Sequence, residues 1–151
     1  MNYTGKIEKL IHLLKSFDAI KALKQSISSA ENVITEAISE EQLFKKGING
    51  DNVSIMSYKP YAPRTIKNKI RKGQPYNRVT LRDSGNFHRS FYLVCKEDSF
   101  YVDAMDPKTE ELLKKYGNSV LKITPENFKE IMQRYIKPVF IANFKNLILH
   151  G

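Results

Sequence analysis

The chain has 151 residues, of which 41 % are hydrophobic and 27 % are charged, a composition typical of a globular protein and not of a disordered one. No apolar run approaches the ~20 residues that a membrane-spanning helix needs, the first residues lack a signal-peptide core, and a single cysteine excludes an intrachain disulfide. The net charge is +9, and residues 59–89 carry most of it, with nine Lys and Arg against one acid.

Two helical patterns occupy the N-terminal part of the chain. Apolar side chains recur there at i, i+3, i+4 and i+7, which predicts an amphipathic helix over residues 6–24. The side chains that form this pattern are Ile7, Leu10, Ile11, Leu14 and Phe17. A second pattern covers residues 27–44 and is stopped by Gly47 and Gly50. The serine-rich stretch 26–29 is the expected break, although one long interrupted helix fits the same pattern.

The next elements are short and surround a proline-rich turn. Residues 53–58 predict a short strand, and Pro60 and Pro63 force an extended loop after it. Residues 65–72 predict a short and very basic helix, which Gly73 closes. This helix leads into the loop that precedes the strands.

The strongest strand signals lie in the second half of the chain. Residues 91–95 and 100–105 are rich in aromatic and β-branched side chains, and residues 96–99 fit a hairpin loop between them. Asp106 followed by Pro107 is typical of a helix start, and Gly117 is the expected end of that helix.

The C-terminal part predicts a short strand and a long helix. Residues 120–123 are the candidate strand, and residues 124–126 begin the last helix with a threonine, a proline and an acid. Pro138 lies inside this helix and should kink or split it.

These elements together predict the α+β class, with a small antiparallel sheet packed against helices and a long C-terminal helix. Residues 1–46 are expected to form an N-terminal helical extension, and residues 47–151 an α+β core, within one compact domain.

The sequence offers no constellation that predicts catalysis, a metal site or a cofactor site. The histidines His12, His88 and His150 stand far apart, and none has the spacing of metal ligands. We interpret His88 as a surface histidine and Cys95, in an apolar run, as a small packed hydrophobe. No phosphate-binding glycine motif is present, and the acid pairs predict solvated helix ends or loops. We therefore expect a protein that is not an enzyme.

The basic segment is the clearest candidate for a binding surface. With Ile66 and Ile70 facing inward at i and i+4, most of its charges should point to solvent or to a partner. The residues expected to form this partner- or DNA-facing patch are Arg64, Lys67, Lys69, Arg71, Lys72, Arg78 and Arg82. Phosphates of DNA and an acidic protein surface are the two alternatives for its partner.

A second distinctive block follows the basic segment, and its chemistry predicts an architectural role. Asp83, Ser84 and Gly85 suit the entry to a helix, because a side-chain oxygen caps the turn and glycine tolerates strained backbone. Phe87 and Phe91 are spaced at i and i+4, so they are expected to bury together. Ser90 completes this expected structural motif.

The two blocks carry a resemblance to a known family. Tyr61–Ile66, Lys69–Gly73 and Val79–Phe91 resemble the short motifs of phage virion-morphogenesis and tail-completion proteins, and Leu112–Gly117 resembles that family's Tyr-Gly stop before its last helix. The similarity covers residues 44–149, so the N-terminal helices are not explained by it. In that family the motifs precede two strands and a final helix.

The resemblance implies a structural virion protein of a tailed phage, a ring-forming head-to-tail connector, neck or tail-completion subunit that joins portal-side and tail-side components. Its implied partners are further copies of itself, other neck, portal or tail proteins and, without sequence preference, the genomic DNA, but no membrane. The implied location is the neck or tail of the virion, with host cytoplasm during assembly. The alternative is a basic nucleic-acid-binding module of phage or mobile-element origin.

Overall fold

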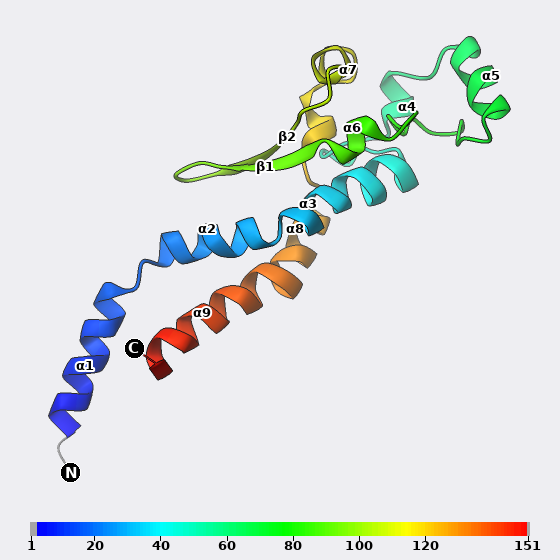
Figure 1. Ribbon diagram of the computed structural model, residues 1–151. Helices are drawn as coiled ribbons and strands as arrows, with labels where there is room; N and C mark the ends of the chain where they lie inside the picture. The colour runs from blue at the N-terminus through cyan, green and yellow to red at the C-terminus, as the bar shows by residue number, and fades with distance from the viewer. Residues whose placement is uncertain (1–2, 151) are drawn as a thin grey trace. The chain divides into compact units, whose positions relative to one another are not determined.

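The computed structural model describes residues 3–150, with side chains from residue 5 onward, and it confirms the predicted α+β class (Figure 1). The contacts divide the chain into two compact units. Unit 1 contains residues 1–30 and 130–151, and unit 2 contains residues 31–129. Within residues 3–150, no helix combines the length and the apolar character that crossing a membrane requires.

Unit 1 is built from helices. Its elements are α1 (Tyr3–Ser16), α2 (Ala19–Ser29), the π-helical segment η3 (Met132–Ile136) and α9 (Lys137–His150). α2 packs along η3 and α9, and α1 touches α9 (Figure 1). Phe17 joins these helices, because its ring meets Phe140 and Phe144 edge-on, with centroids 5.9 and 5.1 Å away.

The predicted helix over residues 6–24 is in fact two helices. The chain leaves α1 at Phe17, and Asp18 starts α2 by accepting a hydrogen bond from the backbone N–H of Lys21 at 2.9 Å. The expected break at the serine-rich stretch is confirmed, since α2 ends at Ser29. The last helical run is not split at Pro138: it passes through the π-helical segment η3 into α9, which contains the proline.

Unit 2 begins with α3 (Glu31–Glu36) and the π-helical segment η1 (Ala37–Lys46), which Gly47 ends at φ 65°. Three short helices follow: α4 (Ile55–Tyr58), α5 (Pro63–Arg71) and α6 (Asn86–Arg89). After the hairpin come α7 (Thr109–Tyr116), the 3-10 helix η2 (Asn118–Leu121) and α8 (Pro125–Ile131), whose last residues pass the boundary of unit 2.

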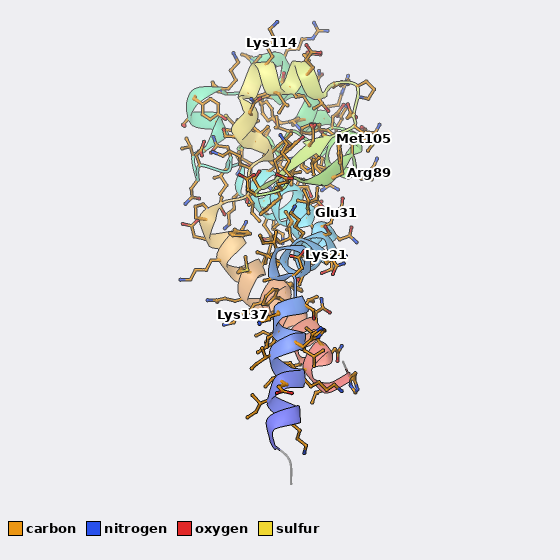
Figure 2. All side chains as sticks on the ribbon, turned by 90° about the vertical axis from the view of Figure 1, so that its left-hand side faces the viewer. Lys21, Glu31, Arg89, Met105, Lys114 and Lys137 are labelled. Atoms are coloured by element: carbon orange, nitrogen blue, oxygen red, sulfur yellow. The ribbon has the colours of Figure 1, made fainter. Side chains whose placement is uncertain are left out.

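The sheet of unit 2 is one antiparallel hairpin, as the sequence predicts. β1 (Phe91–Cys95) pairs with β2 (Phe100–Ala104) in a register that places Phe91 opposite Ala104. The N–H of Lys96 donates to the carbonyl of Ser99 at 2.7 Å and closes the tip. The base is closed by the N–H of Met105, which donates to the carbonyl of Ser90 at 3.1 Å. Met105 and Arg89 accordingly lie near each other in Figure 2.

The core of unit 2 forms where η1, α4 and η2 meet the loop before the hairpin. Its side chains are fully buried and mostly aliphatic, and each is worth about 1.5–3 kcal/mol of transfer free energy. They are Ile34, Ile38, Leu43, Ile55, Val79 and Val120. Ile34, Ile38 and Leu43 anchor residues 31–46 in this core, so these residues group with unit 2, and the observed division differs from the expected boundary after residue 46.

Two expected strands are wrong. Residues 55–58 form α4, and only Ser54 makes a strand-like bridge, to Ile48. Residues 118–121 form η2 in place of the strand expected over 120–123. Both segments are short apolar runs, which serve equally well as one buried helical turn.

Candidate partner-binding surface

The two ends of α5 are set by the residues that flank the helix. Ala62 is extended, Pro63 occupies the first helical turn, and Gly73 follows the C-cap with φ 65°. The helix therefore begins two residues earlier than expected and ends at the expected glycine.

The orientation of α5 contradicts the expected one. Ile66 is half-buried, but Ile70 is 54 % exposed, and its neighbour Lys69 is only 7 % exposed. The Lys69 ammonium donates to the carbonyl of Arg82 at 3.0 Å and lies 5.1 Å from the centroid of the Tyr61 ring. A buried cation is costly without such partners. Lys69 is therefore a structural residue that holds the following loop, and it cannot face a partner.

Lys72 also binds within the chain. Its ammonium donates to the carboxylate of Asp83 at 2.7 Å, and the side-chain amide of Gln74 donates to the backbone carbonyl of Asp83 at 3.1 Å. The hydrogen bond from Lys72 lowers the pKa of the Asp83 carboxyl group below its usual value. The C-terminal end of α5 and the loop that precedes α6 are thereby joined.

Two more residues of the expected patch bind η1. Arg78 donates to the carbonyl of Phe44 at 2.7 Å. Arg82 pairs with Glu40 at 2.9 Å, and its guanidinium lies 4.5 Å from the centroid of the Phe44 ring. An arginine that combines a carboxylate pair with an aromatic face is held in place. These contacts bind both arginines within unit 2.

Only part of the predicted patch is left for a partner. Arg64, Lys67 and Arg71 are exposed, and no ion pair within residues 3–150 involves them. They follow one another at i, i+3 and i+7, so they form one stripe along α5. We define the α5 face as this stripe together with the exposed side chain of Ile70.

The residues of the expected structural motif make local hydrogen bonds and a ring contact. Ser84 caps the turn, with its hydroxyl accepting the N–H of Asn86 at 3.3 Å, and Gly85 has φ 85°. The rings of Phe87 and Phe91 meet edge-on with centroids 4.9 Å apart, as expected. Ser90 donates its hydroxyl to the carbonyl of Phe87 at 2.8 Å. The motif thus turns the chain from the basic segment into β1.

His88 is buried, so its interpretation as a surface histidine is wrong. Its ring nitrogen Nε2 lies 2.9 Å from the carbonyl of Thr80, to which it donates. Burial lowers the pKa of His88 to about 4, which keeps the ring neutral near pH 7. Cys95, by contrast, is exposed at the end of β1 and does not pack as expected.

Two buried polar residues, Gln42 and Asn49, were not among the candidate residues of the sequence. Gln42 is fully buried and bridges η1 to the segment before α8 through the backbone of Lys122 and Thr124. Asn49 accepts the N–H groups of Asp51 and Val53 and shapes the turn that contains Gly50. No local pattern marks Gln42, because its partners lie far along the chain, whereas the two N–H groups that bind Asn49 lie two and four residues after it.

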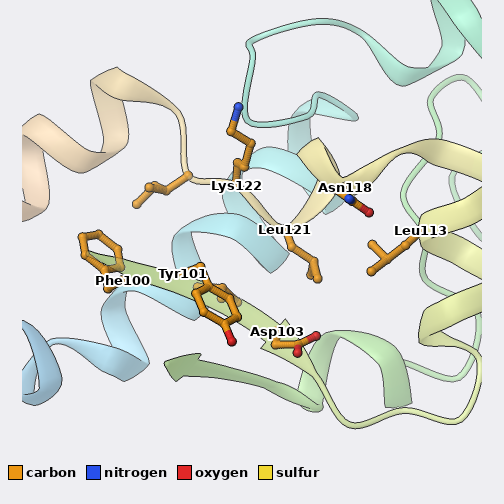
Figure 3. Close-up of a pocket in the computed structure, with 9 residues that line it drawn as sticks. Phe100, Tyr101, Asp103, Leu113, Asn118, Leu121 and Lys122 are labelled. Carbon is orange, nitrogen blue, oxygen red and sulfur yellow. The ribbon is translucent and has the colours of Figure 1, made fainter. Parts of the chain in front are cut away.

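A mostly apolar hollow of unit 2 lies beside β2 (Figure 3). It has a volume of about 540 Å³ and is lined by β2 on one side and by residues 118–123 on the other. Two of its polar side chains are engaged: Asp103 accepts from Tyr92 and from the N–H of Ala104, and Lys122 pairs with Asp51. The hollow can therefore accept an apolar side chain.

Neither a metal-binding cluster of the described residues nor a match to a known protein identifies the site. The described part of the chain contains no group of three His, Cys, Asp or Glu residues that could hold a metal ion. Comparison with protein-family models, with curated proteins and with solved structures found no match. The resemblance to phage proteins consequently depends on the motif residues alone.

Proposed function

We propose that this chain is a structural virion protein of a tailed phage, a ring-forming head-to-tail connector, neck or tail-completion subunit, and not an enzyme. It would join portal-side and tail-side components in the neck, after assembly in the host cytoplasm. The motifs that carry the family resemblance support this proposal, because the block Val79–Phe91 turns the chain into a hairpin and its Asp83, Ser84 and Ser90 side chains bind within the chain.

The observation that carries the proposal is the apolar face of unit 1. The first four apolar residues of the α1 pattern are 40–56 % exposed. They are Ile7, Leu10, Ile11 and Leu14. On α2, Ile20 is 66 % exposed as well. A contiguous stripe of large aliphatic side chains costs free energy in water, so it indicates a surface that becomes covered by another protein subunit.

The first experiment is mass spectrometry of purified virions from the phage that encodes the chain. We expect the protein in the particle at an abundance near that of the portal, because a ring subunit is present in a fixed number of copies. Its absence from particles, or only trace amounts, would refute the assignment to the neck or tail.

A second experiment tests the apolar stripe directly. Changing all four stripe residues of α1 to glutamine keeps good helix formers and should shift the sedimentation of the full chain toward monomer. The matched control changes Lys9 and His12, which are exposed on the same helix, to glutamine and should sediment like the wild type. Equal sedimentation of the stripe variant and the control would refute the role of this face.

The alternative function, a nucleic-acid-binding module, is favoured by the exposed cations of the α5 face and by Tyr76 beyond it, which is 49 % exposed. Binding to duplex DNA should then fall steeply with salt, because neutralised phosphates release counterions. Tight binding to one sequence at physiological salt would favour this alternative over the structural role.

A further inference from the structure

Unit 2 carries opposite charges at its two ends. α5 lies at one end, and the tip of the hairpin projects from the other (Figure 1). The α5 face presents three cations without an ion-pair partner in the described chain. The hairpin tip, residues 96–99, presents Glu97 and Asp98. The two surfaces cannot meet within one molecule.

The tip is a defined acidic surface. All four of its residues are exposed, and the hydrogen bond between Lys96 and Ser99 holds the turn. The positive charge of Lys96 is directed at the ring of Tyr101, whose centroid lies 5.1 Å from the ammonium. The Ser99 hydroxyl donates to one oxygen of Asp98 at 3.2 Å. The other Asp98 oxygen and the whole Glu97 carboxylate form no hydrogen bond or ion pair within residues 3–150.

The α5 face combines charge with an apolar anchor. Ile70 is exposed while the adjacent Lys69 is buried, an arrangement opposite to the one that burial alone would favour. A residue whose exposure opposes folding stability, such as exposed Ile70, is expected at a functional position. An aliphatic side chain beside arginines is typical of a protein interface, whereas phosphates are bound through charge and polar groups.

We propose that the α5 face of one copy binds the acidic hairpin tip of the next copy. Glu97 and Asp98 would pair with Arg64, Lys67 and Arg71, and Ile70 would pack against the hairpin near Tyr101, which is 44 % exposed. Because the contact joins two different surfaces at opposite ends of unit 2, its repetition builds a ring or a filament. The inference rests on the proposed ring-forming function and names the contact between its subunits.

Charge reversal on the full chain tests the contact. One variant carries Arg64→Glu, Lys67→Glu and Arg71→Glu, and a second carries Glu97→Lys and Asp98→Lys. Each should raise the protein concentration at which half of the chains are assembled by about tenfold or more, measured by sedimentation. Since all five side chains are exposed, the urea midpoint of each variant should match that of the wild type.

Complementation makes the test specific. A chain with all five substitutions presents reversed but again complementary surfaces, so its assembly should return toward that of the wild type. An equimolar mixture of the two reversed variants offers both the wild-type pair of surfaces and its charge-reversed counterpart, so alternating copies should assemble although neither variant does so alone. The control changes Lys46, Lys114 and Lys129, exposed lysines of unit 2 outside α5, to glutamate; Figure 2 shows Lys114 on α7. This control should assemble like the wild type.

The outcomes separate this inference from the proposed function. A wild-type chain that stays monomeric at all concentrations would overturn both. An oligomeric wild type that tolerates both reversals, or reversals that disrupt assembly without rescue by the five-fold variant, would overturn this contact and leave the ring proposal standing. Loss of duplex DNA binding by the α5 variant with unchanged assembly would assign the face to nucleic acid and overturn the contact.

Discussion

Replacing Gln42 by leucine should lower the free energy of unfolding by about 3 kcal/mol, because this side chain satisfies two backbone groups of a distant segment. The Gln42 amide nitrogen donates to the carbonyl of Lys122 at 2.9 Å. Its oxygen accepts the N–H of Thr124 at 2.8 Å and the side-chain amide of Asn127 at 3.1 Å. Leucine fills a similar volume but provides neither a donor nor an acceptor.

The magnitude follows from these contacts. Each buried backbone group that loses its partner costs about 1–3 kcal/mol, so the two together cost about 2–6 kcal/mol. Burying an aliphatic side chain in place of the amide returns about 1 kcal/mol. A net loss of about 3 kcal/mol corresponds to a fall in the midpoint of thermal unfolding of roughly 6–12 °C for a chain of this size.

The assay is urea unfolding followed by circular dichroism and by tyrosine fluorescence, which the 8 tyrosines and the lack of tryptophan make convenient. Gln25→Leu is the control, since Gln25 is exposed on α2 and its replacement should change the stability by less than about 0.5 kcal/mol. If Gln42→Leu unfolds within the same narrow range as the control, the hydrogen bonds of Gln42 do not hold the segment before α8 and the reasoning fails.

Three further predictions concern unit 2. Gly50→Ala should destabilise the fold in urea, because an added Cβ would lie 2.4 Å from the carbonyl oxygen of Lys122; a stability equal to that of the wild type would refute this close approach. Phe91→Ala should cost about 3–5 kcal/mol, measured in the same way, and an unchanged midpoint would show that its contact with Phe87 is dispensable. His88 has a folded pKa of about 4, below its ordinary value of 6.5, so the unfolded chain binds the extra proton first. Its contribution, up to about 3 kcal/mol, is present above pH 6.5 and lost as the pH falls toward 4, and in His88→Gln this part of the pH dependence should vanish.

The sequence predicted those features that depend on neighbouring residues. Gly47, Gly73 and Gly117 end helices as expected, because a positive φ is accessible to glycine without a steric penalty. The hairpin was predicted from the strand propensities of residues 91–95 and 100–105, with an error of one residue at the end of β2. In these places the local preference and the fold agree.

Two short elements were decided by tertiary packing. Residues 53–58 and 120–123 have the composition of strands, but each forms one helical turn that buries an aliphatic side chain, Ile55 in α4 and Val120 in η2. The close approach of Gly50 to Ser119, with an N–H to carbonyl distance of 2.8 Å, brings the two segments together. A pattern of four to six residues carries no information about such a neighbour.

The candidate surface shows the same division between local and tertiary information. The composition of residues 59–89 predicted a strongly basic segment, and Asp83, Ser84 and Gly85 predicted the turn toward the hairpin. Which cations remain outward depends on tertiary packing, because the acceptors that bind the others come from distant segments. Glu40 and the carbonyl of Phe44 bind Arg82 and Arg78, and the carbonyl of Arg82 binds Lys69. Because Lys69 faces inward, Ile70 is exposed. This orientation of α5 depends on the loop that contains Arg82, which folds back over the helix and binds Lys69.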